Sequence, residues 1–290
     1  MSILHDFEYY KPADIKSAVE LLDKFGNKAK ILAGGTDLVV QMKENIVTPD
    51  AVIDIKAIDK LNEISLDDET LFIGACVTFT ELMESEIIQK YFPLIKDMSA
   101  TVASMGIRNR ATLVGNICSA VPSADSAPIL LVYDAEVVIK SKSGERIIPI
   151  EQWFAGPKKT VRKDNELVTG VAIHLIKENH AGCYEKLGRY SGEDLAQAGI
   201  CVLVFEDQIY HVAFCAVGPV PKRAEITEKF LNGKEITPEV IKQAKKLLLE
   251  EISPISDIRS SKEYRIHMMD VMFDRGMKKA LNKLRGGTHV

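Results

Sequence analysis

Clustered cysteine is the feature that the sequence most plainly lacks. Its five cysteines, an odd number, lie far apart, and no two of them form a CxxC pair. Iron–sulfur clusters, structural zinc ions and disulfide frameworks depend on closely or regularly spaced cysteine. Scattered thiols are typical of small hydrophobic side chains packed in strands, so we expect the chain itself to bind no metal. The five are Cys76, Cys118, Cys183, Cys201 and Cys215.

Three further absences concern the environment of the protein. No stretch approaches the roughly 18 consecutive apolar residues of a membrane helix, so no membrane association is expected. The N-terminal segment 1–16 has no basic region followed by an apolar run, so we expect no signal peptide and a cytoplasmic location. The net charge is −4, which provides no basic field for a nucleic-acid backbone.

What the sequence does contain is an ordinary globular composition and an α/β pattern in its first part. Hydrophobic residues make up 46% of the 290 residues and charged residues 27%, enough for a buried core. Apolar spacing predicts a helix over 13–25, ended by Gly26, and strands at 30–33 and 51–55. Thr78 with Glu81 is a capping-box pattern, which predicts a helix running to about residue 90.

The last part of the sequence has a different pattern of predicted strands and helices. Four strands follow one another closely, and we expect them to form an antiparallel meander. They are Leu167–Ile176, Cys183–Arg189, Ala198–Phe205 and Ile209–Val217. The pattern is helical from Pro221 onward. The last helix is predicted to begin at Ser260, with an apolar stripe formed by Tyr264, His267, Met268, Val271 and Met272.

Two segments contain residues that suit an extended ligand with phosphate groups. The first is ILAGGTDL, residues 31–38, where glycine lets the backbone approach a ligand and successive N–H groups can bind an anion. It is no GxGxxG motif, and no strongly helical segment is expected directly after it, so a nicotinamide-binding fold is poorly supported. The alternative interpretation is a simple turn that ends a strand.

The second segment is TLVGNICSAVPSADSAP, residues 112–128. It offers hydroxyl and amide groups between small residues, and Asp125 suits sugar hydroxyls better than phosphate because its carboxylate is an acceptor. We expect residues 106–128 to form a long functional loop, since loops beyond about 12–15 residues are usually functional or disordered and this composition does not indicate disorder.

Together these segments resemble the FAD-binding subunits of xanthine dehydrogenase and its relatives, including carbon monoxide dehydrogenase and nicotinate dehydrogenase. The resemblance extends over nearly the whole chain, with the motifs in the family's order and spacing. Seven motifs in register make it highly specific. They are DFEYYKPADIKSAVELL, AGGTDL, IRNRATLVGN, PSADSAP, NELV, YEKLGR and SDIRSSKEYRIHMM.

The resemblance implies a fold of the α+β class. It would consist of a vanillyl-alcohol-oxidase-type FAD-binding domain in two α/β subdomains, followed by a small C-terminal domain with an antiparallel sheet and helices. On this basis we expect the FAD-binding domain over residues 1–177, with subdomains of about 1–57 and 58–177. The C-terminal domain, of the carbon monoxide dehydrogenase flavoprotein type, is expected over residues 178–290.

Carried over by position, the resemblance also implies a set of residues around the cofactor. The first segment would wrap the FAD pyrophosphate with Ile31, Leu32, Ala33, Gly34, Gly35, Thr36, Asp37 and Leu38. The second would face it through Thr112, Gly115 and Asn116, and Asp125 would hold the ribityl or ribose part. Three more residues would lie close to the dinucleotide or its flavin ring: Val102, Leu167 and Lys186.

The chain departs from the family at one position of this set. The family usually has two glycines before the asparagine, where this chain has Val114 and Gly115. A β-branched residue is disfavoured at positive φ. We therefore expect Val114 to adopt an ordinary β conformation and do not count it among the cofactor-binding residues.

The resemblance implies an oxidoreductase subunit that works with two partners. A large subunit would hold the molybdenum cofactor, a small one would carry two iron–sulfur clusters, and the FAD of this chain would pass electrons to NAD. Purine is the expected substrate of the large subunit, and nicotinate or another heteroaromatic compound is an alternative. A free-standing flavin oxidoreductase is a further alternative, although the sequence offers no acid or base placed for it.

Overall fold

The computed structural model describes residues 3–190 and 194–286. Within this part of the chain the strands are β1 (Glu8–Tyr10), β2 (Ala29–Leu32), β3 (Ala51–Asp54), β4 (Ile64–Asp67), β5 (Thr70–Gly74), β6 (Glu136–Ser141), β7 (Gly144–Pro149), β8 (Phe154–Gly156), β9 (Lys159–Thr160), β10 (Leu167–His174), β11 (His180–Leu187), β12 (Ala198–Phe205), β13 (Tyr210–Cys215) and β14 (Lys222–Arg223). The α-helices are α1 (Ile15–Phe25), α2 (Leu38–Lys43), α3 (Phe79–Glu84), α4 (Glu86–Tyr91), α5 (Pro93–Ala100), α6 (Met105–Arg108), α7 (Leu113–Ser119), α8 (Ser126–Val132), α9 (Glu225–Leu231), α10 (Pro238–Glu251) and α11 (Lys262–Leu284).

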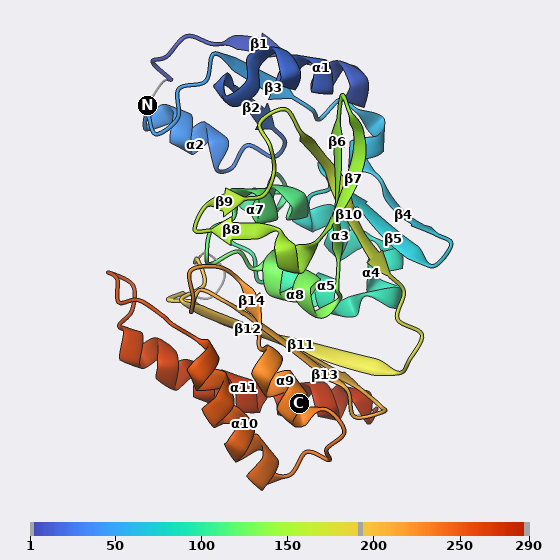
Figure 1. Cartoon of the computed structure of the whole chain (residues 1–290), viewed down its shortest axis with the longest axis vertical. Helices are drawn as coiled ribbons and strands as arrows, with labels where there is room; N and C mark the ends of the chain where they lie inside the picture. The colour runs from blue at the N-terminus through green and yellow to red at the C-terminus, as the bar shows by residue number, and fades with distance from the viewer. Residues whose placement is uncertain (1–2, 191–193, 287–290) are drawn as a thin grey trace.

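The N-terminal elements form a small parallel sheet at one end of the molecule, with the strand order β1-β3-β2 (Figure 1). Helix α1 packs on it through Ala18, Val19 and Leu22. Its ends are set locally, because the Asp14 carboxylate accepts the Ser17 N–H at 2.7 Å and Gly26 follows with a φ of 54°. The helix predicted at 13–25 and the two strands predicted after it are confirmed.

The second sheet is antiparallel, in the order β4-β5-β10-β6-β7. Strand β10 lies at its centre, so the expectation that residues 167–176 begin the C-terminal meander is wrong. Leu167 to Val171 are buried without alternation, as in a strand covered on both faces, and the hydrogen-bonding partners on its two edges are not C-terminal strands. Those partners, β5 and β6, come from earlier in the chain.

A layer of short helices, α3 to α8, connects the second sheet to the C-terminal sheet (Figure 1). The single helix predicted after Thr78 is two helices, because Ser85 adopts an extended conformation and caps the second one through the Ile88 N–H. The long loop predicted over 106–128 is also wrong. Most of it is helical, since Thr112 caps α7 and apolar side chains of α7 and α8 reach the core.

The C-terminal strands β11, β12, β13 and β14 form an antiparallel meander in chain order, which confirms the predicted meander for its last three strands. This sheet separates two hydrophobic cores. Along β12, Cys201 and Leu203 belong to the core shared with α5 and α8, whereas Ile200 and Val202 belong to the core beneath α11. The expected α+β architecture, with a C-terminal antiparallel sheet and helices, is therefore confirmed.

The buried side of the long C-terminal helix α11 overlaps the predicted stripe only in part: Met272 is buried and Met268 packs against the core beneath the helix, whereas His267 is exposed. The cap of α11 is Ser261 rather than Ser260, and Tyr264 is 48% exposed. The buried positions are Arg265, Met269, Met272, Phe273, Gly276, Met277 and Ala280. An apolar pattern alone could not have found this face, because a fully buried arginine occupies its first turn. No helix in residues 3–190 or 194–286 is long and apolar enough to cross a membrane.

Arg265 ties α11 to the end of the C-terminal sheet. The side chain is 1% exposed, and Nη1 donates to the carbonyls of Gln197 at 2.7 Å and Ala216 at 3.1 Å. Nη2 lies 2.8 Å from the Asp257 carboxylate. The neighbouring guanidinium groups Arg259 and Arg265 hold the pKa of Asp257 well below its ordinary value, despite the opposing effect of desolvation.

Replacing Arg265 with methionine is therefore expected to destabilise the chain by about 3–5 kcal/mol, because the substitution leaves the carbonyls of Gln197 and Ala216 without their buried donor and removes one of the two guanidinium partners of Asp257. Urea unfolding at neutral pH measures the change. Arg275→Met, on the exposed side of the same helix, is the matched control and should alter stability by less than about 0.5 kcal/mol. Equal unfolding midpoints for the two variants would contradict this role of Arg265.

Candidate functional site

The two segments singled out by their composition are in direct contact in the structure. The first, residues 33–37, joins β2 to α2, and the second begins just before α7. A Cβ atom added to Gly34 would lie 1.8 Å from the carbonyl oxygen of Arg110, so the two backbones touch at this point. The Ser119 hydroxyl also donates to the Asp37 carboxylate. Segments about 80 residues apart in the sequence thus form one continuous surface.

The first segment has the backbone geometry that its glycines predict. Gly35 has a φ of 78°, a conformation that favours glycine, and an added Cβ would lie 2.8 Å from Leu32 Cδ1. Residues 31–36 are half-buried and Asp37 is exposed, so the segment faces the surface. Contrary to expectation, a six-residue helix, α2, follows directly, and Met42 is its buried residue.

The second segment is organised by the start of α7. Thr112 caps this helix, accepting the Gly115 N–H at 2.9 Å, and a Cβ on Gly115 would lie 2.7 Å from the same hydroxyl oxygen. Asn116 accepts the backbone N–H of Ser126 at 3.2 Å, which ties α7 to the start of α8. Val114 lies inside α7 and is buried, so the β conformation expected for it is wrong, although its φ is not positive.

A buried charged cluster lies at the start of α8. Asp125 is 5% exposed, and its two carboxylate oxygens accept hydrogen bonds from Tyr184 at 2.6 Å and Lys186 at 2.9 Å. Lys186 also donates to the Thr101 carbonyl at 3.0 Å. Burial raises the pKa of Asp125, while the neighbouring ammonium and phenol groups act in the opposite direction. The structure thus brings Asp125 and Lys186, predicted separately, into one ion pair.

Tyr184 is a member of this cluster that the sequence reasoning missed. It lies two positions before Lys186 on β11, so the alternation of a strand places both side chains on the same face. Given a functional role for Lys186, that spacing was a signal that could have pointed to Tyr184. Burial raises the pKa of Tyr184 well above its ordinary value, so the phenol stays protonated at neutral pH and donates its hydrogen bond to Asp125.

Two other predicted residues, Val102 and Leu167, are buried in the hydrophobic core, and Val102 directly follows Thr101, whose carbonyl accepts Lys186. Val102, just after α5, is 6% exposed, and its carbonyl accepts Arg108 Nη1 at 2.8 Å. Leu167 is fully buried at the start of β10, where it pairs with Lys140. Leu167 therefore contributes to the core, and no part of the residue is exposed.

Contacts within the protein connect the two glycine-containing segments to the charged cluster. A line of hydrogen bonds and backbone contacts runs from Gly34 through Arg110 and α7 to Ser126 and Asp125, and on to Lys186. Along this line the Ser126 hydroxyl is buried and has no hydrogen-bond partner among the described residues. A buried polar atom without a partner is costly, and a ligand hydroxyl or phosphate oxygen would satisfy it.

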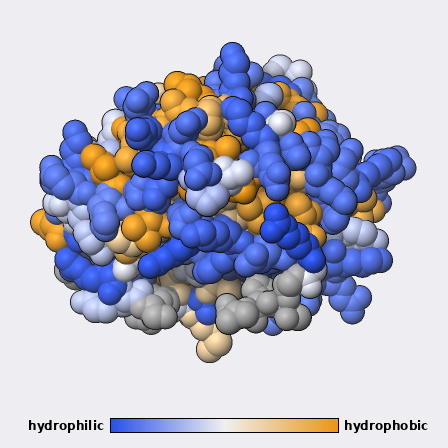
Figure 2. Space-filling view, turned by 90° about the horizontal axis from the view of Figure 1, so that it is seen from below, coloured by the Kyte–Doolittle hydropathy of each residue, from blue (hydrophilic) through white to orange (hydrophobic). Residues whose placement is uncertain are grey.

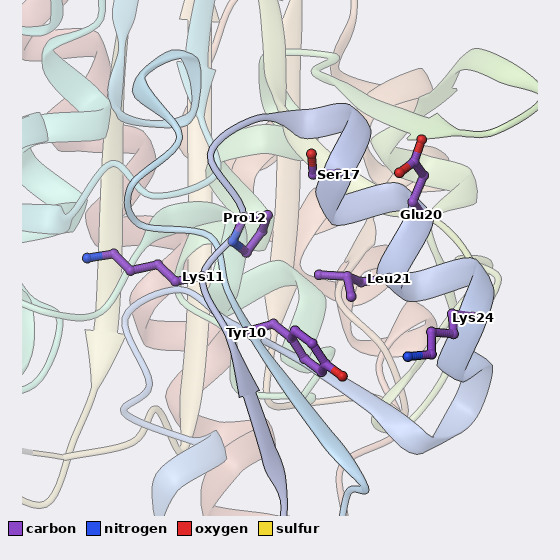
Figure 3. A pocket seen from close by; sticks show the side chains of 7 residues that line it. All are labelled: Tyr10, Lys11, Pro12, Ser17, Glu20, Leu21 and Lys24. Carbon is purple, nitrogen blue, oxygen red and sulfur yellow. The ribbon is translucent and has the colours of Figure 1, made fainter.

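Two other cavities contain none of the candidate residues. One, of about 410 Å³, lies between Tyr10–Pro12 and α1 (Figure 3). The other, of about 560 Å³, is a groove between α10 and α11 with Met277 and Leu281 among its apolar lining. Figure 2 views that end of the molecule and shows small hydrophobic areas separated by hydrophilic side chains. Neither cavity joins the contact between the two glycine-containing segments.

The thiols and histidines of the described residues form no group of three or more metal-ligating side chains. All five cysteines are free. Burial raises the pKa of Cys118 to about 11 and that of Cys183 to about 12, so both thiols are protonated at neutral pH. A protonated thiol is a poor metal ligand and a poor nucleophile.

Two family models match the chain, one after the other. Residues 5–174 match the family model described as the FAD binding domain in molybdopterin dehydrogenase. Residues 182–280 match the model described as the CO dehydrogenase flavoprotein C-terminal domain. The first model spans the parallel sheet and the second sheet, and the second model spans most of the C-terminal sheet and the helices that follow it.

Individual relatives align with nearly the whole chain. It is 31% identical to the carbon monoxide dehydrogenase medium chain of Hydrogenophaga pseudoflava, over 94% of this chain and 96% of that one. It is also 31% identical to a xanthine dehydrogenase FAD-binding subunit of Escherichia coli, over 96% and 97%. A solved structure of the Hydrogenophaga pseudoflava enzyme has a TM-score of 0.93 at 30% identity, covering 97% of this chain and 99% of that chain. Because the first family model covers more than half of the sequence and these relatives match it end to end, the chain belongs to the family of FAD-binding subunits of the molybdenum hydroxylases.

Proposed function

We propose that this chain is the flavin subunit of a xanthine dehydrogenase-type enzyme and relays electrons from iron–sulfur clusters to NAD through bound FAD. The observation that carries the proposal is the backbone contact of Gly34 with Arg110, continued through α7 to the buried Asp125–Lys186 pair. This line of groups suits a long ligand with phosphates at one part and sugar hydroxyls at another. Bound FAD would supply the exchange between one-electron and two-electron carriers.

Each part of the line has a role in this proposal. Residues 31–38 hold the pyrophosphate through their backbone, and Thr112, Gly115 and Asn116 border it from the start of α7. Asp125 accepts a hydroxyl of the ribityl or ribose part. Val102 packs near the dinucleotide, and Leu167 and the ammonium group of Lys186 lie near the flavin ring, where a cation favours its anionic reduced form.

We also propose that the functional division of the chain falls at residue 177, with FAD held mainly by residues 1–177. The last strand of the second sheet, β10, ends at His174, and the first strand of the C-terminal sheet, β11, begins at His180. Within the first part, residues 1–57 contain the parallel sheet and residues 58–177 the second sheet. Residues 178–290 add Lys186 to the flavin end of the site.

The proposed partners are a large subunit with the molybdenum cofactor and a small subunit with two iron–sulfur clusters. The support is that relatives are named as medium chains or FAD-binding subunits, which are parts of larger enzymes. The described part of the chain contains no group of three or more His, Cys, Asp or Glu side chains that could hold a metal ion. Substrate hydroxylation therefore belongs to another polypeptide in this proposal.

A second candidate is the flavin subunit of a carbon monoxide dehydrogenase. The specific observation in its favour is that the identity to the carbon monoxide dehydrogenase medium chain, 31%, equals that to the xanthine dehydrogenase subunit. The two candidates assign the same roles to the residues of this chain. They differ in the substrate of the large subunit and in the electron acceptor.

Purified chain is expected to contain one FAD, which NADH reduces in the absence of oxygen. Hydride transfer between nicotinamide and flavin is reversible, so NADH can test the acceptor reaction without the partner subunits. Acid release and chromatography identify the cofactor, and loss of the oxidised-flavin absorption band measures the reduction. Release of FMN or of no flavin would overturn the proposal. Bound FAD that NADH leaves oxidised would remove NAD as the acceptor and favour the second candidate.

A further inference from the structure

Tyr184 joins the two main parts of the chain through a single hydrogen bond. It lies on β11 of the C-terminal sheet, and its hydroxyl donates to Asp125 Oδ1, at the start of α8, over 2.6 Å. Asp125 Oδ2 accepts the Lys186 ammonium group at 2.9 Å. One carboxylate thus holds two side chains of the same strand, one on each oxygen, and each oxygen can still accept a second hydrogen bond.

The alternation of β11 separates this contact from the packing of the C-terminal helix. Tyr184 and Lys186 point toward Asp125, whereas Glu185, between them, forms an ion pair with Lys279 of α11 at 2.7 Å. The side chains that face α8 are therefore distinct from those that fasten β11 to α11. Changing the Tyr184 hydroxyl leaves the Glu185–Lys279 pair in place.

The neighbouring strands leave room for the Tyr184 ring. Gly199 of β12 lies beside it, and an added Cβ there would be 2.8 Å from the Tyr184 hydroxyl oxygen and 2.6 Å from Cys215 Sγ. Cys215 Sγ itself lies 3.7 Å from that hydroxyl. A thiol is a weak hydrogen-bonding group, so Asp125 is the strong partner of the phenol.

We propose that Tyr184 is a positioning residue, which orients the Asp125 carboxylate and through it fixes the Lys186 ammonium group at the flavin end of the site. Lys186 Nζ has three N–H donors, and the Thr101 carbonyl and Asp125 accept two of them. These two hydrogen bonds fix the direction of the third N–H of Lys186. The inference rests on the proposed FAD-binding function and adds to it the residue that sets the geometry of the Asp125–Lys186 pair.

The test compares Tyr184→Phe with Tyr210→Phe. Tyr210 is a matched control, because it is a buried tyrosine of the same sheet whose hydroxyl donates to a backbone carbonyl, that of Lys234, at 2.9 Å. Tyr184→Phe is expected to raise the dissociation constant of FAD about tenfold and to shift the absorption band of the bound flavin. Tyr210→Phe should leave the dissociation constant and the absorption band unchanged, even if it lowers the unfolding temperature by as much as Tyr184→Phe does.

The pH dependence of FAD binding provides a readout that a structural role would not move. Asp125 faces Tyr184 and Lys186 on β11 and lies near Cys215 on β13, and the Tyr184 hydrogen bond lowers its pKa against the effect of burial. Removing that bond raises the pKa of Asp125 further. As the pH is lowered, the variant should therefore lose FAD affinity at a higher pH than the unmodified chain.

Hydrogen exchange on the unmodified chain tests the inference without a variant. FAD should slow the exchange of the β11 amides around Tyr184, because a fixed Lys186 couples the strand to the cofactor. Unchanged exchange there, or identical FAD affinity and pH midpoint for Tyr184→Phe and the unmodified chain, would overturn the positioning role alone. An unmodified chain that binds no FAD would instead overturn the proposed function.

Discussion

Gly34→Ala is expected to abolish FAD retention. The added methyl carbon would lie 1.8 Å from the Arg110 carbonyl oxygen and 3.1 Å from Ala111 Cα, far inside van der Waals contact with backbone atoms. Neither segment can relieve the clash by a side-chain movement, so the two segments must separate. Because the proposed site is the surface that these segments form together, their separation removes the pyrophosphate contacts from both sides.

Gly106→Ala is the matched control for this prediction. Gly106 lies four residues before Arg110 in α6, and a Cβ added to it would meet no atom within 4 Å. The control should retain FAD at one per chain, since alanine is a better helix former than glycine. Flavin absorbance per chain measures retention, and the thermal unfolding temperature shows whether each variant folds. Full flavin content in folded Gly34→Ala would contradict the assignment of the two segments to the cofactor.

The parts of the fold that were predicted correctly are those that local chemistry determines. Helix α1 has its cap at Asp14 and its stop at Gly26 within the same short segment, and the hairpin of the meander likewise pairs neighbours in the chain. The prediction that placed β10 in the C-terminal meander was wrong because its partners, β5 and β6, lie 27 or more residues away in the sequence. Hydrophobic spacing reports which face is buried and carries no information on which strand will cover it.

The candidate site shows the same limit. The glycine content of residues 31–38 singled out Gly34 and Gly35 as candidate binding residues. The contact of Gly34 with Arg110 depends on the parallel sheet and on α7, and neither segment alone predicts it. The family resemblance named Asp125 and Lys186 separately, and only the structure shows that they form an ion pair. Tyr184 was missed because its role comes from a partner 59 residues away, although its spacing from Lys186 was visible.

Asp125→Ala is expected to weaken FAD binding by about one to two orders of magnitude and to destabilise the chain. The ion pair is enclosed, with the side chains of Lys186 and Asp125 10% and 7% exposed. Removing the carboxylate leaves the ammonium group of Lys186 and the hydroxyl of Tyr184 buried without their acceptor. Loss of one partner of a buried pair typically costs about 3–5 kcal/mol, because the remaining charge is uncompensated.

Two variants separate the loss of FAD affinity from the loss of stability. Adding Lys186→Met to Asp125→Ala removes the uncompensated charge, so the double variant should recover much of the stability measured by urea unfolding and still bind FAD weakly. Asp50→Ala removes a partner of a surface pair, in which Lys28 is 67% and Asp50 50% exposed, and should cost less than about 1 kcal/mol with no change in FAD affinity. Titration of flavin into each cofactor-free variant gives the affinities. If Asp125→Ala binds FAD as tightly as the unmodified chain, the carboxylate serves only to hold the two domains together, and the sugar contact belongs to another residue.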